Sequence, residues 1–172
     1  MRHGFSVLAG LFFVACVPAS STPVAPPPAG LPNVELVNLD GAATRLPEAM
    51  AGRPTLVSLW ATWCEACQKE FGPLGKLSDR ARAEGGWVVA VDVGEPRAEV
   101  ARFVKDHGLR YDQLVDEQFH FADALGQRRV PATLVLDGAG AVRHRGGDLD
   151  AAALDAFRTV LSMQSTHAGA TQ

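Results

Sequence analysis

Two apolar runs of strand length, residues 55–60 and 87–93, stand out from an otherwise mixed sequence. Strands with so few polar side chains are typical of a parallel sheet that is covered on both faces. A helical pattern begins at about Cys64, directly after the first run, and a second helix is expected to begin at Pro96 and to end at Gly108. This order of strand, helix, strand and helix predicts an α/β domain with a parallel core sheet.

Shorter elements are expected at the sides of this core. They are strands at 34–39, 111–115 and 132–136, a short helix at 119–125, and a hairpin strand at 142–145 that follows a glycine-rich turn. A final helix carries Leu154, Phe157 and Leu161 on one face. The sequence therefore predicts a central mixed sheet with an antiparallel edge and helices on both faces.

The composition excludes some classes of protein. Hydrophobic residues make up 47% of the 172 residues and charged residues 20%, as in globular rather than disordered chains. A formal net charge of −3 leaves no basic surplus, so we expect no nucleic-acid partner. No apolar run is long enough to serve as a permanent membrane helix.

The amino-terminal segment has the pattern of an export signal. Residues 1–15 combine a basic start with a short apolar stretch, which is typical of a signal peptide. The stretch ends in Phe-Val-Ala-Cys, which is similar to a bacterial lipobox and predicts that Cys16 is acylated and anchors the protein to a membrane. Plain secretion, with cleavage after Ala19 and loss of Cys16, is the alternative.

These boundaries divide the chain into four parts. A lipoprotein signal peptide (1–15) precedes the lipidated Cys16 and a tether rich in Pro, Ala and Ser (16–32). A single domain is expected at 33–163, and a flexible tail at 164–172. The domain would thus be held at a membrane on the extracytoplasmic, periplasmic side.

Cys64 and Cys67 lie where the first buried strand passes into a helix. Two thiols three residues apart on a helix share one face and are close enough to form a disulfide. Cys64 comes first, at the helix amino terminus, where free N–H groups and the helix dipole favour the attacking thiolate. The pattern predicts that Cys64 is the nucleophile and that Cys67 resolves the mixed disulfide.

Two other roles for the cysteine pair have weaker support in the sequence. A structural disulfide that closes so short a loop would constrain the unfolded chain little. A zinc site would need two more ligands, and the chain has no further cysteine in the domain. His107, His120 and His144 show no metal-binding spacing and are expected at the surface.

Residues 63–71, Trp-Cys-Glu-Ala-Cys-Gln-Lys-Glu-Phe, resemble the active site of the TlpA/ResA-like branch of the thioredoxin superfamily. The Asp-Gly pair at 40–41 and Val-Pro-Ala-Thr at 130–133 fit the same pattern, so the resemblance covers the whole domain. It implies a thioredoxin-like fold in which Pro131 is cis and packs beside the cysteines. Residues implied to contact the client protein are Trp63, Glu65, Ala66 and Val130.

The resemblance also implies a role for Glu70. Members of this branch carry a glutamate three residues after the second cysteine, whereas thioredoxins carry a buried aspartate where Ser58 stands. A half-buried carboxylate at Glu70 would have a raised pKa and would exchange the proton of Cys67. The alternative is an exposed carboxylate that pairs with Lys69 or Lys76.

One position departs from the family pattern. A proline that kinks the helix is usual where Gly72 stands, and here Pro73 follows it. We therefore expect the kink to be shifted. Glu65 is expected to be exposed and to oppose the ionisation of Cys64 slightly.

By resemblance, the chain is a protein-disulfide reductase for exported proteins, such as apocytochromes c or a copper-site assembly protein. Electrons would come from a membrane thiol transporter of the DsbD/CcdA kind, and we expect a monomer with no cofactor besides the Cys64–Cys67 disulfide. A thiol oxidase or isomerase and a copper-chaperone-type binding module remain alternatives on the same fold. A peroxiredoxin is disfavoured because Ala61 stands where such proteins carry threonine.

Overall fold

The computed structural model describes residues 30–169, and the predicted export segment with Cys16 lies outside the described residues. The strands are β1 (Glu35–Asn38), β2 (Ala43–Arg45), β3 (Thr55–Trp60), β4 (Trp87–Val93), β5 (Asp112–Asp116), β6 (Ala132–Leu136) and β7 (Val142–Gly146). The helices are α1 (Leu46–Met50), α2 (Glu65–Ala83), α3 (Arg97–Asp106), α4 (His120–Ala124) and α5 (Ala151–Gly169).

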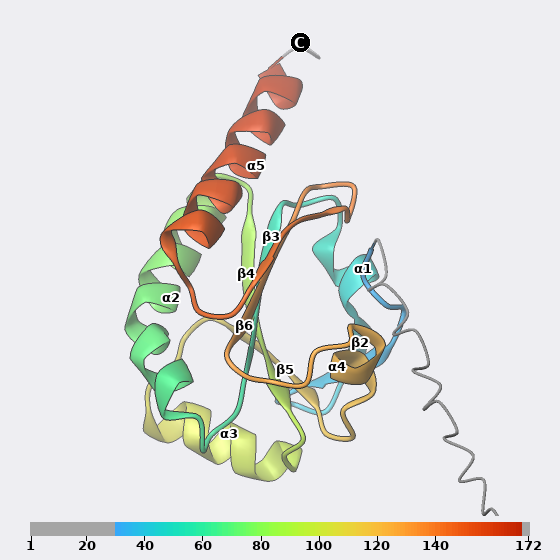
Figure 1. Ribbon diagram of the computed structural model, residues 1–172, viewed down its shortest axis with the longest axis vertical. Helices are drawn as coiled ribbons and strands as arrows, with labels where there is room; N and C mark the ends of the chain where they lie inside the picture. Colours follow the sequence, from blue (N-terminus) through green and yellow to red (C-terminus); the bar gives the residue numbers. More distant parts are fainter. Residues whose placement is uncertain (1–29, 170–172) are drawn as a thin grey trace, which may run out of the picture.

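All seven strands form one mixed sheet in the order β2-β1-β5-β4-β3-β6-β7 (Figure 1). The three central strands, β3, β4 and β5, are parallel to one another. β6 and β7 extend the sheet antiparallel on one side, and β1 and β2 do so on the other. The predicted parallel core with an antiparallel edge is confirmed, and the sheet has an antiparallel edge on each side.

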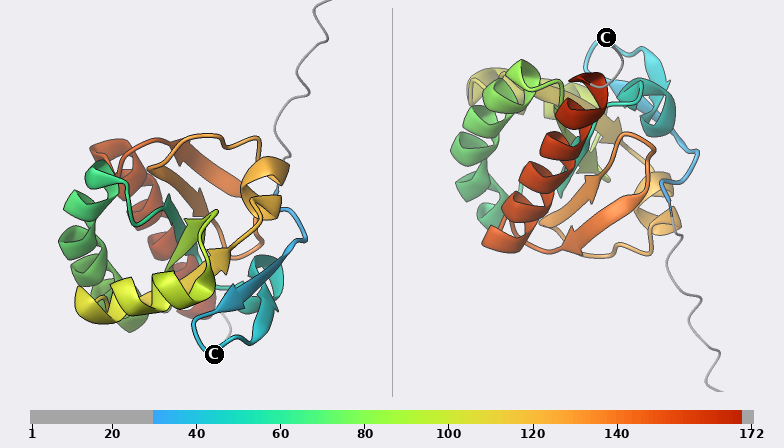
Figure 2. Two further views of the ribbon diagram at one scale, coloured as in Figure 1. Left: turned by 90° about the horizontal axis from the view of Figure 1, so that it is seen from below. Right: turned by 90° about the horizontal axis from the view of Figure 1, so that it is seen from above.

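Helices cover both faces of the sheet. Figure 2 shows α2, α3 and α5 on one side and α1 and α4 on the other. The residues of β3 divide between the two cores: Leu56 and Trp60 pack on the side of α2, whereas Val57 and Leu59 pack on the opposite side. Burial on both faces explains why this strand reads as an unbroken apolar run.

The strands with the strongest apolar pattern, β3, β4 and β6, have the bounds that the sequence predicts. The other predicted strands and helices also form, with their ends shifted by a few residues. β2 and α1 were not predicted. β2 has only three residues and α1 only five, with a proline in its first turn, so neither is long enough to produce a periodic pattern.

At both ends, the described fold extends beyond the expected range of 33–163. Gly30 forms a β-bridge with Ala141 and Leu31 packs against the core, so the folded part begins before residue 33. At the other end, α5 continues to Gly169 instead of giving way to a tail at 164. No glycine or proline interrupts residues 151–168, so nothing in the sequence ends the helix earlier.

The three parallel strands have their carboxyl ends at the same end of the sheet. The loops that leave them, at 61–64, 94–96 and 117–119, therefore lie at the same end of the molecule. Binding sites of open α/β sheets form at such edges. In the described range 30–169, no helix is both long and apolar enough to span a membrane.

Candidate active site

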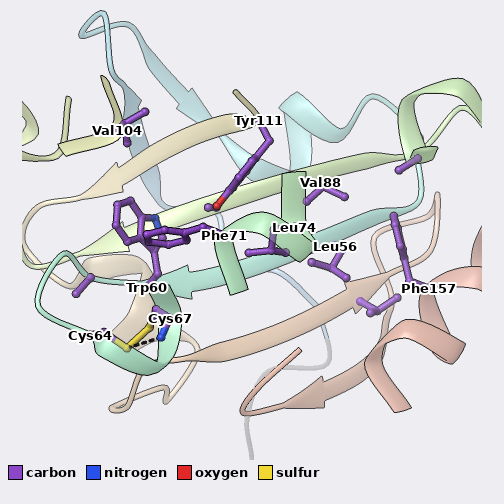
Figure 3. Close-up of a cluster of buried hydrophobic side chains, with 14 of the residues drawn as sticks. Leu56, Trp60, Cys64, Cys67, Phe71, Leu74, Val88, Val104, Tyr111 and Phe157 are labelled. Carbon is purple, nitrogen blue, oxygen red and sulfur yellow. Dashed lines mark hydrogen bonds between the residues drawn. A yellow bond between two sulfur atoms is a disulfide. The ribbon is translucent and has the colours of Figure 1, made fainter. Parts of the chain in front are cut away.

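Cys64 and Cys67 form a disulfide at the start of α2, with an S–S distance of 2.09 Å and a Cα–Cα distance of 5.3 Å. Cys64 is the N-cap of this helix, and its Sγ accepts the backbone N–H of Cys67 at 3.2 Å (Figure 3). A helix amino terminus stabilises negative charge, so this geometry favours the Cys64 thiolate once the disulfide is reduced. Both residues are nearly covered, with exposed fractions of 6% and 1%.

Aromatic rings pack in the core next to the disulfide. Trp60, the last residue of β3, meets Phe71 of α2 edge to face at 5.1 Å between ring centroids. Phe103 of α3 lies 5.6 Å from Trp60 and closes the cluster. Trp60 and Phe71 belong to the same buried cluster as both cysteines (Figure 3), and Phe103 packs against that cluster. The rings therefore fix the beginning of α2 against the sheet.

The peptide bond between Val130 and Pro131 is cis, as the resemblance implies. The next residue, Ala132, pairs with Leu59 in the antiparallel ladder of β6 and β3. Pro131 therefore lies opposite the carboxyl end of β3, at the edge of the sheet from which the chain continues to Cys64. The fold brings these two segments together although they are more than sixty residues apart.

A groove of about 400 Å³ opens at Trp63, the residue before Cys64. Trp63, which is 67% exposed, and Val130 line it. Its other lining residues are Leu59, Val93, Gln118, Phe119, Ala122, Asp123, Gln127, Arg128 and Arg129. Glu65 and Ala66 are exposed on the first turn of α2 but do not line this groove.

Phe119 is a groove residue that the sequence pattern did not reveal. Its backbone is left-handed, with φ of 62°, and its side chain is 47% exposed. The ring lies so close to Gly94 that any side chain at position 94 would collide with it. A bulky residue in this conformation is strained, and such strain is often found at functional sites.

Glu70 is half-buried, and its Oε1 accepts the backbone N–H of Leu149 at 2.8 Å. Burial raises the pKa of Glu70, and the nearby Asp148 charge raises it further, while the Leu149 bond opposes both. Among the described residues, neither Lys69 nor Lys76 forms an ion pair with it. The carboxyl group of Glu70 is thus half-buried, and its pKa lies above the ordinary value.

Tyr111 is a buried ionisable residue on which the charge of Glu70 acts. The residue is buried, and its hydroxyl group has no hydrogen-bond partner among the described residues. Burial raises the pKa of Tyr111, the Gln113 side chain lowers it, and the charge of Glu70 raises it slightly. Figure 3 shows the hydroxyl end of Tyr111 directed towards Phe71, one residue after Glu70.

Ser58 and Pro73 stand at two positions where the sequence departs from related patterns, and the structure shows the surroundings of both. Ser58 is buried in the middle of β3, so no carboxylate occupies the position that thioredoxins use. Pro73 lies inside α2, which remains one helix from Glu65 to Ala83. Because proline has no N–H, the carbonyl of Lys69 loses its helical donor one residue later than in the family pattern.

Thr62, in the loop before Cys64, is held by contacts that the sequence did not predict. Its N–H and its hydroxyl donate to the carboxylate of Glu95, at 2.6 and 2.5 Å. The amide of Gln68 donates to the Thr62 carbonyl oxygen at 2.7 Å. Thr62 and Glu95 are 33 residues apart and meet only because β3 and β4 end side by side.

Metal-ligand side chains do not gather within residues 30–169, where no group of three or more is found. His107 and His120 are exposed as expected. His144 is a correction, because it is half-buried in β7 and its Nε2 has no hydrogen-bond partner among the described residues. Pairing with β6 covers this side chain, which the hairpin pattern alone could not show.

Comparison with known proteins agrees with this geometry. The model of the AhpC/TSA family matches residues 29–145. Thiol-disulfide oxidoreductase ResA of Halalkalibacterium halodurans is 31% identical over 117 residues, which cover 67% of this chain and 66% of the relative. Thiol:disulfide interchange protein DsbE of Pasteurella multocida is 35% identical over 101 residues, which cover 58% of this chain and 54% of the relative. The aligned segment thus spans just under two thirds of the first relative and about half of the second.

A solved structure shows the same fold. A secreted thiol-disulfide isomerase from Corynebacterium glutamicum superimposes with a TM-score of 0.68 at 24% identity, over 77% of this chain and 85% of that one. The mixed sheet with helices on both faces is the thioredoxin-like arrangement.

Proposed function

Because the chain belongs to the AhpC/TSA family, with relatives named as thiol-disulfide oxidoreductases, we propose that it exchanges disulfides with client proteins through Cys64 and Cys67. The observation that carries the proposal is the disulfide at the amino terminus of α2, in which the Sγ of Cys64 accepts a helix N–H. A purely structural disulfide has no need of this position.

The exchange proceeds in two steps that conserve electrons. The Cys64 thiolate attacks one sulfur of a client disulfide, forms a mixed disulfide and releases the other client sulfur as a thiolate, which water protonates. Cys67 then loses its proton and attacks the sulfur of Cys64, and the client leaves as a dithiol. Two electrons pass to the client, and the Cys64–Cys67 disulfide is formed.

Glu70 is the group that we assign to the proton of Cys67. It lies one helical turn beyond Cys67 on α2, and burial keeps its pKa above the ordinary range of glutamate. A carboxyl group with a pKa closer to neutral exchanges protons more readily with a thiol. Its bond to Leu149 holds the carboxylate in place during the exchange.

The client is expected to bind across the groove between Trp63 and Phe119. Both rings are largely exposed, and the groove reaches Val130, which precedes the cis proline. An extended client segment that pairs with backbone there would bring its disulfide to Cys64. The rim carries Arg128 and Arg129 as well as Asp123, so polar contacts surround an apolar floor.

The direction of exchange, the location and the partners follow from the resemblance to the TlpA/ResA-like branch. We place the domain outside the cytoplasm, anchored through an acylated Cys16, where it reduces disulfides of exported proteins such as apocytochromes c. An oxidising compartment already forms disulfides, so a reductase there needs a supply of electrons. A membrane thiol transporter of the DsbD/CcdA kind would provide them.

Measurement of the reduction potential tests this proposal. The protein is equilibrated in dithiothreitol or glutathione buffers, and the fraction of reduced Cys64–Cys67 pair is determined. A potential near that of thioredoxin, about −270 mV, supports a reductase, whereas a value near that of DsbA, about −120 mV, indicates an oxidase. Absence of a reversible couple would reject thiol exchange, and tight stoichiometric copper binding by the reduced protein would then favour a chaperone.

The order of attack is tested by trapping. The Cys67→Ser variant retains the proposed nucleophile and is expected to accumulate a mixed disulfide with a client peptide. The matched Cys64→Ser variant retains the more buried thiol and is expected to trap little. Equal trapping by both variants would contradict the assignment of Cys64.

A further inference from the structure

Asp92 is a buried carboxyl group that the proposed exchange does not use. It is fully covered near the carboxyl end of β4, where it pairs in register with Trp60 of β3. Its neighbours Val91 and Val93 belong to the core on the side of α1 and α4, so Asp92 faces the side of α2 and α3. Neither of its oxygens meets the geometry of a hydrogen bond with a described residue.

The charged groups that act on Asp92 are both acidic. They are Glu95 in the loop after β4 and Asp116 at the end of β5. The carboxylate of Asp116 is already bonded to the N–H groups of Phe121 and Ala122, at 3.1 and 2.8 Å. Glu95 follows Asp92 by three residues, and its carboxyl group raises the pKa of Asp92 whereas its N–H lowers it.

Two adjacent carboxyl groups in a buried site do not ionise together. Burial and the nearby Glu95 raise the pKa of Asp92 to about 9. Asp92 therefore holds its proton at neutral pH. Glu95, which accepts two hydrogen bonds from Thr62, is the member that carries the charge.

The charge of Glu95 is used to hold the turn that leads to Cys64. Both donors of Thr62 bond to Glu95, while Gln68 of α2 binds the Thr62 carbonyl oxygen from the other side. The N–H of Cys64 closes the turn onto the carbonyl of Ala61 at 3.1 Å. Thr62 thus connects β4 to the position of Cys64 at the start of α2.

We propose that Asp92 and Glu95 share one proton, and that this acid pair positions Cys64 by holding Thr62. While Asp92 is protonated, it places no second negative charge near Glu95, and the carboxylate of Glu95 stays bonded to Thr62. When Asp92 loses this proton, the two carboxylates repel, Glu95 withdraws from Thr62 and the turn before Cys64 loosens. The inference rests on the proposed function, because it concerns the reactivity of Cys64.

The first test follows the alkylation rate of the reduced protein against pH. The wild type is expected to show, besides the ionisation of Cys64, a second transition above neutral pH. Asp92→Asn keeps a hydrogen-bond donor but cannot ionise, so it should lack the second transition. Asp79→Asn, the same change at an exposed site on α2, should retain it.

A second variant tests the connection itself. Thr62→Val keeps the N–H but loses the hydroxyl donor to Glu95. The loss of one hydrogen bond should raise the thiol pKa of Cys64 and slow alkylation at neutral pH by about threefold. Profiles of Asp92→Asn and Thr62→Val that superimpose on the wild-type profile would overturn the positioning role.

An independent measurement addresses the shared proton. Infrared spectra at neutral pH should show one protonated carboxyl band in the wild type that Asp92→Asn lacks and Asp79→Asn retains. Loss of no band in Asp92→Asn would overturn the shared proton. This readout does not require a redox couple, so a wild type without a reversible couple would reject the proposed function alone.

Discussion

At the scale of single residues, Glu70 offers a direct test of proton transfer. In the Glu70→Gln variant, we expect the reduction of a client disulfide to slow by about a hundredfold, the usual lower range for loss of a general acid–base group. Because the pKa of Glu70 is raised, the wild-type rate should increase with pH through a transition above the ordinary glutamate range, and the variant should lack it. Stopped-flow measurement of the reaction against pH checks both expectations.

A matched variant guards against a general effect of the substitution. Glu84→Gln makes the same change at the exposed C-cap of the same helix, far from the disulfide. Its rate and pH profile should match those of the wild type. A Glu70→Gln variant with an unchanged profile would show that Cys67 exchanges its proton with water.

Asp92 makes the stability of the domain depend on pH. The folded protein keeps this proton up to about pH 9, whereas the unfolded chain loses it near the ordinary aspartate pKa, about 3.9. Between these values the unfolded state binds fewer protons, so the free energy of unfolding falls as pH rises, by up to about 1.4 kcal/mol per pH unit. Asp92→Asn cannot ionise in either state and should remove this slope.

Thermal unfolding of the wild type and Asp92→Asn between pH 4 and pH 9 measures the effect. The variant should gain stability over the wild type progressively towards alkaline pH, and Asp79→Asn should not. A constant difference between variant and wild type at all pH values would mean that Asp92 is ionised in the folded protein.

At the scale of elements, the glycines of α2 allow a comparison within one helix. A Cβ at Gly75 would meet nothing closer than 4.0 Å, from Tyr111. Gly75→Ala should therefore stabilise the domain by about 1 kcal/mol, the difference in helix propensity. Gly72 is also open to solvent, but it precedes Pro73, whose ring disfavours helical backbone at a residue with a Cβ.

Chemical denaturation of both variants checks this reasoning. Gly72→Ala should gain less than Gly75→Ala although both positions have room for a methyl group. Equal gains would show that α2 accommodates Pro73 without the help of a glycine before it.

The elements also show how far the sequence predicts the fold. β3, β4 and β6 could be predicted to the residue because burial on both faces leaves an unbroken apolar signal. β2 and α1 could not, because three and five residues are too few for a period to appear. The half-buried strand β7 alternates polar and apolar residues weakly, and its turn rather than its pattern identified it.

The residues of the candidate site also divide into those that the sequence predicts and those that it does not. Cys64 and Cys67 could be predicted from local spacing, and Pro131 and Glu70 from resemblance to a known motif. Phe119 and the contact of Thr62 with Glu95 could not, because they depend on which loops the sheet order brings together. Spacing along the chain carries no information on such contacts.

At the scale of the whole molecule, the start of the folded part can be tested by truncation. A chain that begins at Gly30 keeps the bridge to Ala141 and the packing of Leu31, so its melting temperature should equal that of a chain with the full tether. A chain that begins at residue 34 loses both. It should be less stable by about 1 kcal/mol, since Leu31 is only partly buried. Calorimetry of the two chains would show no difference if the segment 30–33 contributes nothing.

The near-complete burial of Cys64 and Cys67 has a consequence for the whole molecule. Exposed fractions of 6% and 1% leave little surface for collision with small thiols, whereas the exposed Trp63 beside them offers a protein something to bind. Electrons held by the pair should therefore exchange only slowly with the surrounding pool of small thiols and disulfides. As the proposed reductase, the domain would then keep its electrons in an oxidising solution, and its selectivity would depend on which protein surfaces bind beside Cys64.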